Sequence, residues 1–200
     1  MRLVQFRTVQ NQRAVARVEG DQLMVLEGIT YIAELAKDAI SAGRNLAQTV
    51  YATTSSETVN YDDVLKEGRM LPPIDLPDLR HVQVTGTGLT HMGSADTRDA
   101  MHAKVSADAA DLSDSMKIFK MGLDGGKPAD DKTGVQPEWF WKGDGTILRA
   151  CGQDMESPHW ADDMGEEPEI AGIYIIGDNG QPHRLGYALA NELSDHVMER

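Results

Sequence analysis

The sequence is poor in cysteine and in positive charge, and each shortage argues against a class of protein. Cys151 is the only cysteine, so no disulfide can form within the chain, which fits a reducing compartment. Lys and Arg number 19 against 32 Asp and Glu, for a formal net charge of −13. Nucleic acids and anionic membrane surfaces are bound by concentrated positive charge, so we expect neither as a partner.

Long apolar runs are also missing. The first residues, MRLVQFRTVQNQRAV, lack the continuous apolar core of a secretory signal, and no stretch approaches the ~20 apolar residues of a membrane helix. We therefore expect a soluble, cytoplasmic protein. Its 200 residues suffice for one domain, or for one domain with a small appendage.

Short alternating runs open the chain. Residues 2–7, 12–18 and 22–26 alternate apolar and polar side chains and are separated by turn residues, which predicts an antiparallel meander. A helical pattern follows over 31–42, and Thr30 occupies the position of an N-terminal cap. These elements together predict a small N-terminal α/β domain.

Prolines 72, 73 and 77 mark an extended connector, because the residue before a proline is pushed out of the helical region. A boundary near 72–78 predicts an N-terminal domain over 1–75 and a second domain over 76–200. The elements expected in the second domain are a mostly helical segment over 94–121 and strands over 138–142, 147–150, 170–176 and 183–190.

The end of the sequence combines a hairpin with a group of glutamates. Asp-Asn-Gly at 178–180 is a strong turn signal between the last two expected strands, and Asn191 has the position of a cap for a following helix. Glu167 and Glu169 are two residues apart, so they project from the same face of an extended strand. The hairpin returns Glu192 to their neighbourhood.

Three carboxylates at one site repel one another unless a cation lies among them. A hard divalent ion such as Mg²⁺, with Mn²⁺ or Ca²⁺ as substitutes, prefers oxygen ligands and keeps positions open for a substrate. The alternative is a solvated acidic rim at the end of the hairpin, and the spacing alone leaves both interpretations open.

Ordered motifs in the second domain resemble the fumarylacetoacetate hydrolase superfamily. The stretch GEEPEIAGIYIIG…LGYALANELSDH is similar to its E-x-E, strand, G-Y-x-x-x-N-D-x-S signature, and PEWFWK resembles its P-x-F-x-K run. The phrases VTGTGLTHMGSADTRD and GVQPEWFWKGDG resemble the GguC-like branch, which is found beside sugar-acid genes. The matching features span about residues 80–196.

The resemblance implies a fold and a metal site. The implied fold is α+β and β-rich, with a mixed β-sheet or β-roll core that this chain leaves incomplete. Glu167 and Glu169 match the two glutamate ligands, and Glu192 matches the aspartate of N-D with one extra methylene. His91 lies near the family's histidine-bearing loop and is the candidate general base, with a structural histidine as the alternative. The candidate substrate-binding residues are Lys142, Ser94 and Arg98, for which a surface position or a helix start is the alternative.

The implied reaction begins with a 2-oxo acid chelated by Mg²⁺, which acidifies the C3 proton and yields a metal-bound enolate. Loss of a C4 hydroxyl would complete the dehydration of a 2-keto-3-deoxy sugar acid of the L-arabinonate type. The alternative enzyme is a hydrolase that cleaves a C–C bond in acylpyruvates or diketo acids. The family also implies a homodimer.

A hypothesis of another class is an inactive fragment or a non-catalytic sugar-acid-binding protein. The chain stops at Arg200 inside a predicted helix, while the resemblance implies further strands and a functional lysine after that point.

Overall fold

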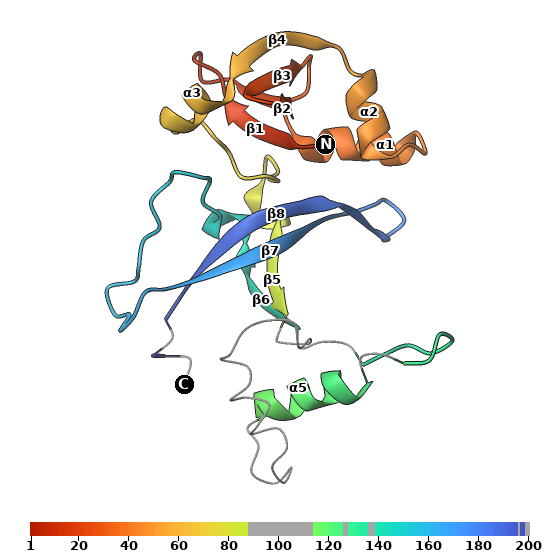
Figure 1. The fold of residues 1–200 in the computed structure, drawn as a ribbon, viewed down its shortest axis with the longest axis vertical. Coiled ribbons are helices and arrows are strands. Elements are labelled where there is room, and N and C mark those ends of the chain that lie inside the picture. The colour runs from red at the N-terminus through yellow and green to blue at the C-terminus, as the bar shows by residue number, and fades with distance from the viewer. Residues whose placement is uncertain (88–113, 126–127, 136–138, 196, 199–200) are drawn as a thin grey trace. The chain divides into compact units, whose positions relative to one another are not determined.

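The structure, a computed structural model, describes residues 1–87, 114–125, 128–135, 139–195 and 197–198. The chain divides into two compact units, one made of residues 1–82 with 147–200 and the other of residues 83–146. The described part is strand-rich and mixed α/β, and its strands form open sheets (Figure 1). The domain boundary near 72–78 stays a prediction.

The N-terminal sheet is antiparallel, with neighbouring strands in chain order. Its strands are β1 (Leu3–Arg7), β2 (Arg13–Glu19), β3 (Gln22–Leu26) and β4 (Ser55–Asn60). The first three confirm the predicted meander. β4 was not predicted because its sequence, SSETVN, is mostly polar and has little β-propensity. It forms because the edge of β3 offers it a complete ladder, with a register shift at Val25 and Leu26.

Helices cover this sheet. They are α1 (Ile32–Ser41), α2 (Leu46–Ala52) and α3 (Tyr61–Lys66). The expectation that Thr30 caps α1 is wrong. Tyr31 holds the cap position without a side-chain bond, and the Thr30 hydroxyl donates to Glu34 at 3.2 Å instead.

The core of this region lies on both faces of the sheet. One cluster joins Phe6 and Leu23 to Val64 of α3, and all three are fully buried. The other joins Val15 and Leu26 to residues of α1 and α2, including Leu35 and Val50. Alternation along the strands sends successive side chains to opposite faces, so helices are needed on both sides.

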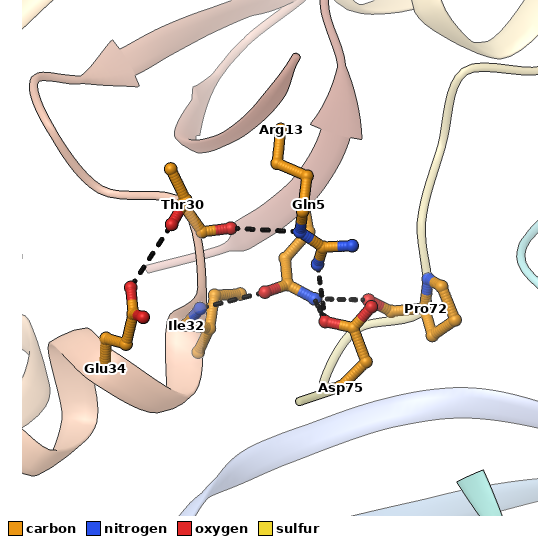
Figure 2. A network of polar contacts seen from close by, with 7 residues as sticks. All are labelled: Gln5, Arg13, Thr30, Ile32, Glu34, Pro72 and Asp75. Atoms are coloured by element: carbon orange, nitrogen blue, oxygen red, sulfur yellow. Dashed lines mark hydrogen bonds and ion pairs between the residues drawn. The ribbon is translucent and has the colours of Figure 1, made fainter. Parts of the chain in front are cut away.

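A buried polar network ties the connector to the sheet (Figure 2). The side chain of Gln5 is fully buried, and its Nε2 donates to the carbonyl of Pro72 at 2.9 Å and to Asp75 at 2.8 Å. Its Oε1 accepts the backbone N–H of Ile32 at 2.8 Å, and Arg13 pairs with the same Asp75 oxygen at 2.5 Å. The amide nitrogen and the amide oxygen of the Gln5 side chain thus both have hydrogen-bond partners within the chain, as a buried amide requires.

The second unit contains a two-stranded antiparallel ribbon, β5 (Gln83–Thr87) with β6 (Trp139–Asp144), and the helix α5 (Asp114–Gly125). A short 3-10 turn, η1 (Leu79–His81), precedes β5. β6 confirms the strand expected over 138–142. α5 overlaps the end of the helix that was expected over 94–121. Residues 94–113 of that expected helix lie outside the described part.

The strand predicted over 147–150 is wrong. A 3-10 turn, η3 (Gly145–Ile147), occupies its start, and no strand follows before residue 151. The cause is local, because the Asp144 carboxylate accepts both the N–H of Thr146 at 2.9 Å and its hydroxyl at 2.5 Å. Such an Asx turn competes with strand pairing.

The longest strands are β7 (Gly165–Ile176) and β8 (Pro182–Ser194), which form an antiparallel hairpin. The predicted turn is confirmed, with Gly180 at φ +74° and its N–H bonded to the carbonyl of Gly177 at 2.8 Å. The helix expected after Asn191 is wrong, because Asn191 pairs with Pro168 and the strand continues to Ser194. None of the helices described here has the length and apolar character needed to cross a membrane.

Candidate metal centre

The open end of the β7–β8 hairpin carries the three expected glutamates on one face. Glu167 stands directly opposite Glu192 in the strand register, and Glu169 lies two residues further along β7. Alternation along a strand keeps Glu167 and Glu169 on the same side. One ligand oxygen from each of the three side chains lies within 4.8 Å of the others. The structure therefore brings together the three residues that the sequence singled out.

Burial differs among the three glutamates. Glu167 and Glu192 are half-buried, whereas Glu169 is exposed. The Oε2 atom of Glu192 has almost no contact with solvent. Like charges that stand directly opposite each other on neighbouring strands destabilise the pairing, so Glu167 and Glu192 would oppose hairpin formation without a compensating charge.

The donor set fits a hard divalent cation. Mg²⁺ binds oxygen at about 2.1 Å, so two ligands on opposite sides of the ion are about 4.2 Å apart, and for Ca²⁺ the separation is about 5 Å. The 4.8 Å limit on the three oxygens is of this order. Three carboxylates without nitrogen or sulfur favour Mg²⁺, Ca²⁺ or Mn²⁺ over softer metals. The described residues contain no second such group of His, Cys, Asp and Glu.

Asp195 follows β8 and accepts hydrogen bonds from backbone N–H groups on both sides of the hairpin. Its carboxylate accepts the N–H of Asp162 at 2.8 Å and those of Val197 and Met198 at 3.0 Å each. Desolvation raises the pKa of Asp195, but the backbone N–H donors outweigh it and hold the pKa below its ordinary value. Asp195 thereby joins the segment before β7 to the segment after β8.

The remaining candidate residues are placed elsewhere or not described. His91, Ser94 and Arg98 lie outside the described residues, so their roles stay predictions. Lys142 is on β6, in the other compact unit, with its ammonium 5.1 Å from the centre of the Phe140 ring. Gly86 on β5 makes room for this pair, because a Cβ there would lie 2.7 Å from the Phe140 ring.

A shallow cavity of about 200 Å³ opens on the N-terminal sheet, and none of the residues predicted to be functional is among those that line it. It is lined by Thr8, Gln12, Arg13, Ala14, Val25, Leu26, Gly28, Ile29, Thr30 and Glu57. The Arg13 side chain is already engaged by Asp75 and stacks over Tyr31 at 4.1 Å. This leaves the glutamate cluster as the stronger candidate for a functional site.

Two features of the site were not predicted from the sequence. Asn191 reads as a helix cap, which hid the strand pairing that places Glu192 directly opposite Glu167. Counting outward from the Asp-Asn-Gly turn would have revealed this pairing to within a residue or two. Asp195 was not singled out either, since a lone aspartate after a strand has no distinctive pattern.

Comparison of the chain with protein-family models, with curated proteins and with solved structures finds no match.

Proposed function

We propose that this chain is a Mg²⁺-dependent cytoplasmic enzyme of the fumarylacetoacetate hydrolase superfamily that acts on a 2-oxo acid. The preferred reaction is the dehydration of a 2-keto-3-deoxy sugar acid, which makes it a hydro-lyase. One observation carries the proposal: oxygens of Glu167, Glu169 and Glu192 lie within 4.8 Å of one another on one face of a hairpin. The order of the sequence motifs supports it.

Each glutamate would contribute one carboxylate oxygen to the ion. The metal, when bound, supplies a Lewis acid that polarises the keto group of the substrate. Three carboxylates bring more negative charge than a divalent ion neutralises, so the cluster favours a divalent over a monovalent cation. Glu167 and Glu192 hold their positions through the strand ladder, and the exposed Glu169 has the greater freedom to adjust.

The first experiment tests the metal site. Titration calorimetry with Mg²⁺, or Mn²⁺ titration followed by electron paramagnetic resonance, would compare the unmodified chain with Glu169→Gln. We expect at least a tenfold loss of affinity, because the neutral amide is a poorer ligand. The matched control is Glu166→Gln, an exposed neighbour on the opposite face, which should bind as tightly as the unmodified chain. Equal affinity in Glu169→Gln and the control would reject the carboxylate triad.

The second experiment tests the reaction. The chain with Mg²⁺ is incubated with 2-keto-3-deoxy-arabinonate, and in parallel with an acylpyruvate, and the products are followed by chromatography. We expect the sugar acid to lose water, and a chelator to stop the reaction. Cleavage of the acylpyruvate alone would assign the hydrolase instead. Metal binding with turnover of neither substrate would contradict the enzyme proposal and favour the binding-protein hypothesis.

A further inference from the structure

The two ends of the β7–β8 hairpin are closed in different ways. At one end the chain itself joins the strands, because Ile176 pairs with Pro182 across the turn. At the other end the last pair of the ladder is Gly165 with Ser194, and no turn joins them. Glu167 is the third residue of β7, so the candidate metal centre lies at the end that has no covalent closure.

A position near the open end makes the glutamate pair prone to separation. Paired strands open first where their ladder stops. Two residues of strand span about 7 Å, so the Glu167–Glu192 pair lies only that far from the last pair of the ladder. Like charges that stand directly opposite each other favour opening further. A cation site on these strands therefore needs a link that holds the open end together before the ion arrives.

Asp195 supplies such a link. It follows Ser194 directly, and its Oδ2 atom accepts the backbone N–H of Asp162, which precedes β7, at 2.8 Å. Its Oδ1 atom accepts the backbone N–H groups of Val197 and Met198, which follow β8, at 3.0 Å each. One carboxylate therefore holds backbone groups of both segments that flank the hairpin, and hydrogen bonds to a charged acceptor are stronger than those between neutral groups.

Asp195 is not itself one of the gathered ligands. The oxygens that lie within 4.8 Å of one another belong to Glu167, Glu169 and Glu192. Both oxygens of Asp195 already accept backbone N–H groups. Its contribution to the metal centre is therefore indirect, through the positions of the two strands that carry the glutamates.

We propose that Asp195 is a positioning residue of the metal centre, which closes the open end of the hairpin and keeps Glu167 paired with Glu192 before a cation binds. This inference rests on the proposed metal site. The apparent affinity for an ion falls with the fraction of molecules in the conformation that can bind it. If loss of the link leaves the open end closed in about a tenth of the molecules, the Kd for Mg²⁺ rises about tenfold.

Asp195→Asn tests the link, because the amide keeps one oxygen as an acceptor but its NH₂ group cannot accept the N–H of Asp162. Calorimetric titration with Mg²⁺ should give a Kd about tenfold higher than that of the unmodified chain. Glu166→Gln, which removes the same charge next to Glu167, is the control and should bind normally. Hydrogen exchange should quicken at the open end and not at the turn. Saturating Mg²⁺ should restore that protection, because binding and closure are reciprocally coupled.

A disulfide separates closure from charge. In a Cys151→Ser background, Asp162→Cys with Asp195→Cys gives a chain whose oxidised and reduced forms have the same net charge and differ only in the link. The oxidised form, identified by its loss of free thiols, should bind Mg²⁺ about tenfold more tightly than the reduced form. Equal affinity of these two forms, or of Asp195→Asn and Glu166→Gln, would overturn the inference and leave the metal site in place. No Mg²⁺ binding by the unmodified chain would overturn both.

Discussion

The N-terminal sheet and the β7–β8 hairpin use strands in opposite ways. The strands of the meander have five to seven residues, yet Phe6 and Leu23 are completely buried between sheet and helices. The hairpin strands have 12 and 13 residues, and Leu189 at their middle is 91% exposed. Strand length therefore contributes little burial by itself, and the layers packed on a sheet decide how much apolar surface leaves water.

The polar groups of the two regions also differ in where their partners lie. The buried Gln5 amide finds its partners inside the chain, at Pro72, Asp75 and Ile32. The glutamates at the hairpin's open end concentrate charge of one sign, which an external cation would balance. The buried amide of the N-terminal region therefore has its hydrogen-bond partners within the chain, whereas the hairpin gathers like charges at its open end.

The largest expected effect separates core from surface. Phe6→Ala should lower the free energy of unfolding of the N-terminal region by about 3–5 kcal/mol, because it removes a fully buried ring. Leu189→Ala should change the free energy of unfolding by less than about 0.5 kcal/mol, because that side chain is exposed. Urea unfolding followed by circular dichroism compares the two, and similar losses would show that the contrast between the regions is false.

A smaller loss is expected when the polar network is broken. Gln5→Leu keeps the volume of the side chain but leaves the Ile32 N–H and the Pro72 carbonyl without their buried partner. The expected cost is about 1–3 kcal/mol. Native-state hydrogen exchange of the β1 and β2 amides measures it, with Gln12→Leu as the exposed control. Equal exchange in the two variants would contradict a stabilising role for the network.

In the hairpin, by contrast, one substitution is expected to increase stability. Without metal, Glu192→Gln relieves the like-charge pair with Glu167 and should stabilise the hairpin by about 0.2–1 kcal/mol. Saturating Mg²⁺ should reverse this order, because only the unmodified chain keeps all its ligands. Hydrogen exchange of the β7 and β8 amides, with and without Mg²⁺, reports both states. A variant less protected than the unmodified chain in the absence of metal would argue against repulsion.

The smallest expected effect concerns pH. The pKa of Asp195 is lower in the folded chain than in the unfolded one, so its stabilising bonds are fully present above the unfolded value. They are lost as pH falls through the folded pKa, which places the change below about pH 4. Protection of the Asp162 and Val197 amides should decline over that range. Asp195→Asn should remove this dependence, and a decline that persisted in the variant would assign it to another group.

Much of the fold could be predicted where the local pattern and the tertiary contacts agree. The alternation of β1 to β3 and the Asp-Asn-Gly turn lead directly to the observed meander and hairpin. β4 could not be found in this way, because the free edge of β3, and not the residues of SSETVN, determines that it forms a strand. The prediction that Asn191 caps a helix was wrong for a related reason. Asn191 pairs with β7, which begins at Gly165, and this strand pairing overrides its propensity to cap a helix.

The candidate site shows the same division. The spacing of Glu167 and Glu169 indicates a common face, and the structure agrees because both lie in one regular strand. The position of Glu192 depends on the strand register, which is set by the turn and by the register shift between Ile173 and Tyr174, and it cannot be read from spacing alone. Asp195 depends on backbone N–H groups from two separate segments, which leave no trace in the sequence.

The alternation of the hairpin has a consequence for how this protein can vary. Side chains on a strand change face at every residue, so one insertion or deletion between Gly177 and Gln181 would shift β8 by one position. Glu192 would then move to the side of Ile170, and Leu189 would move to the side of Glu167 and Glu169. Length changes in this loop are therefore expected to be tolerated only in steps of two residues, a constraint that a library of loop variants would reveal.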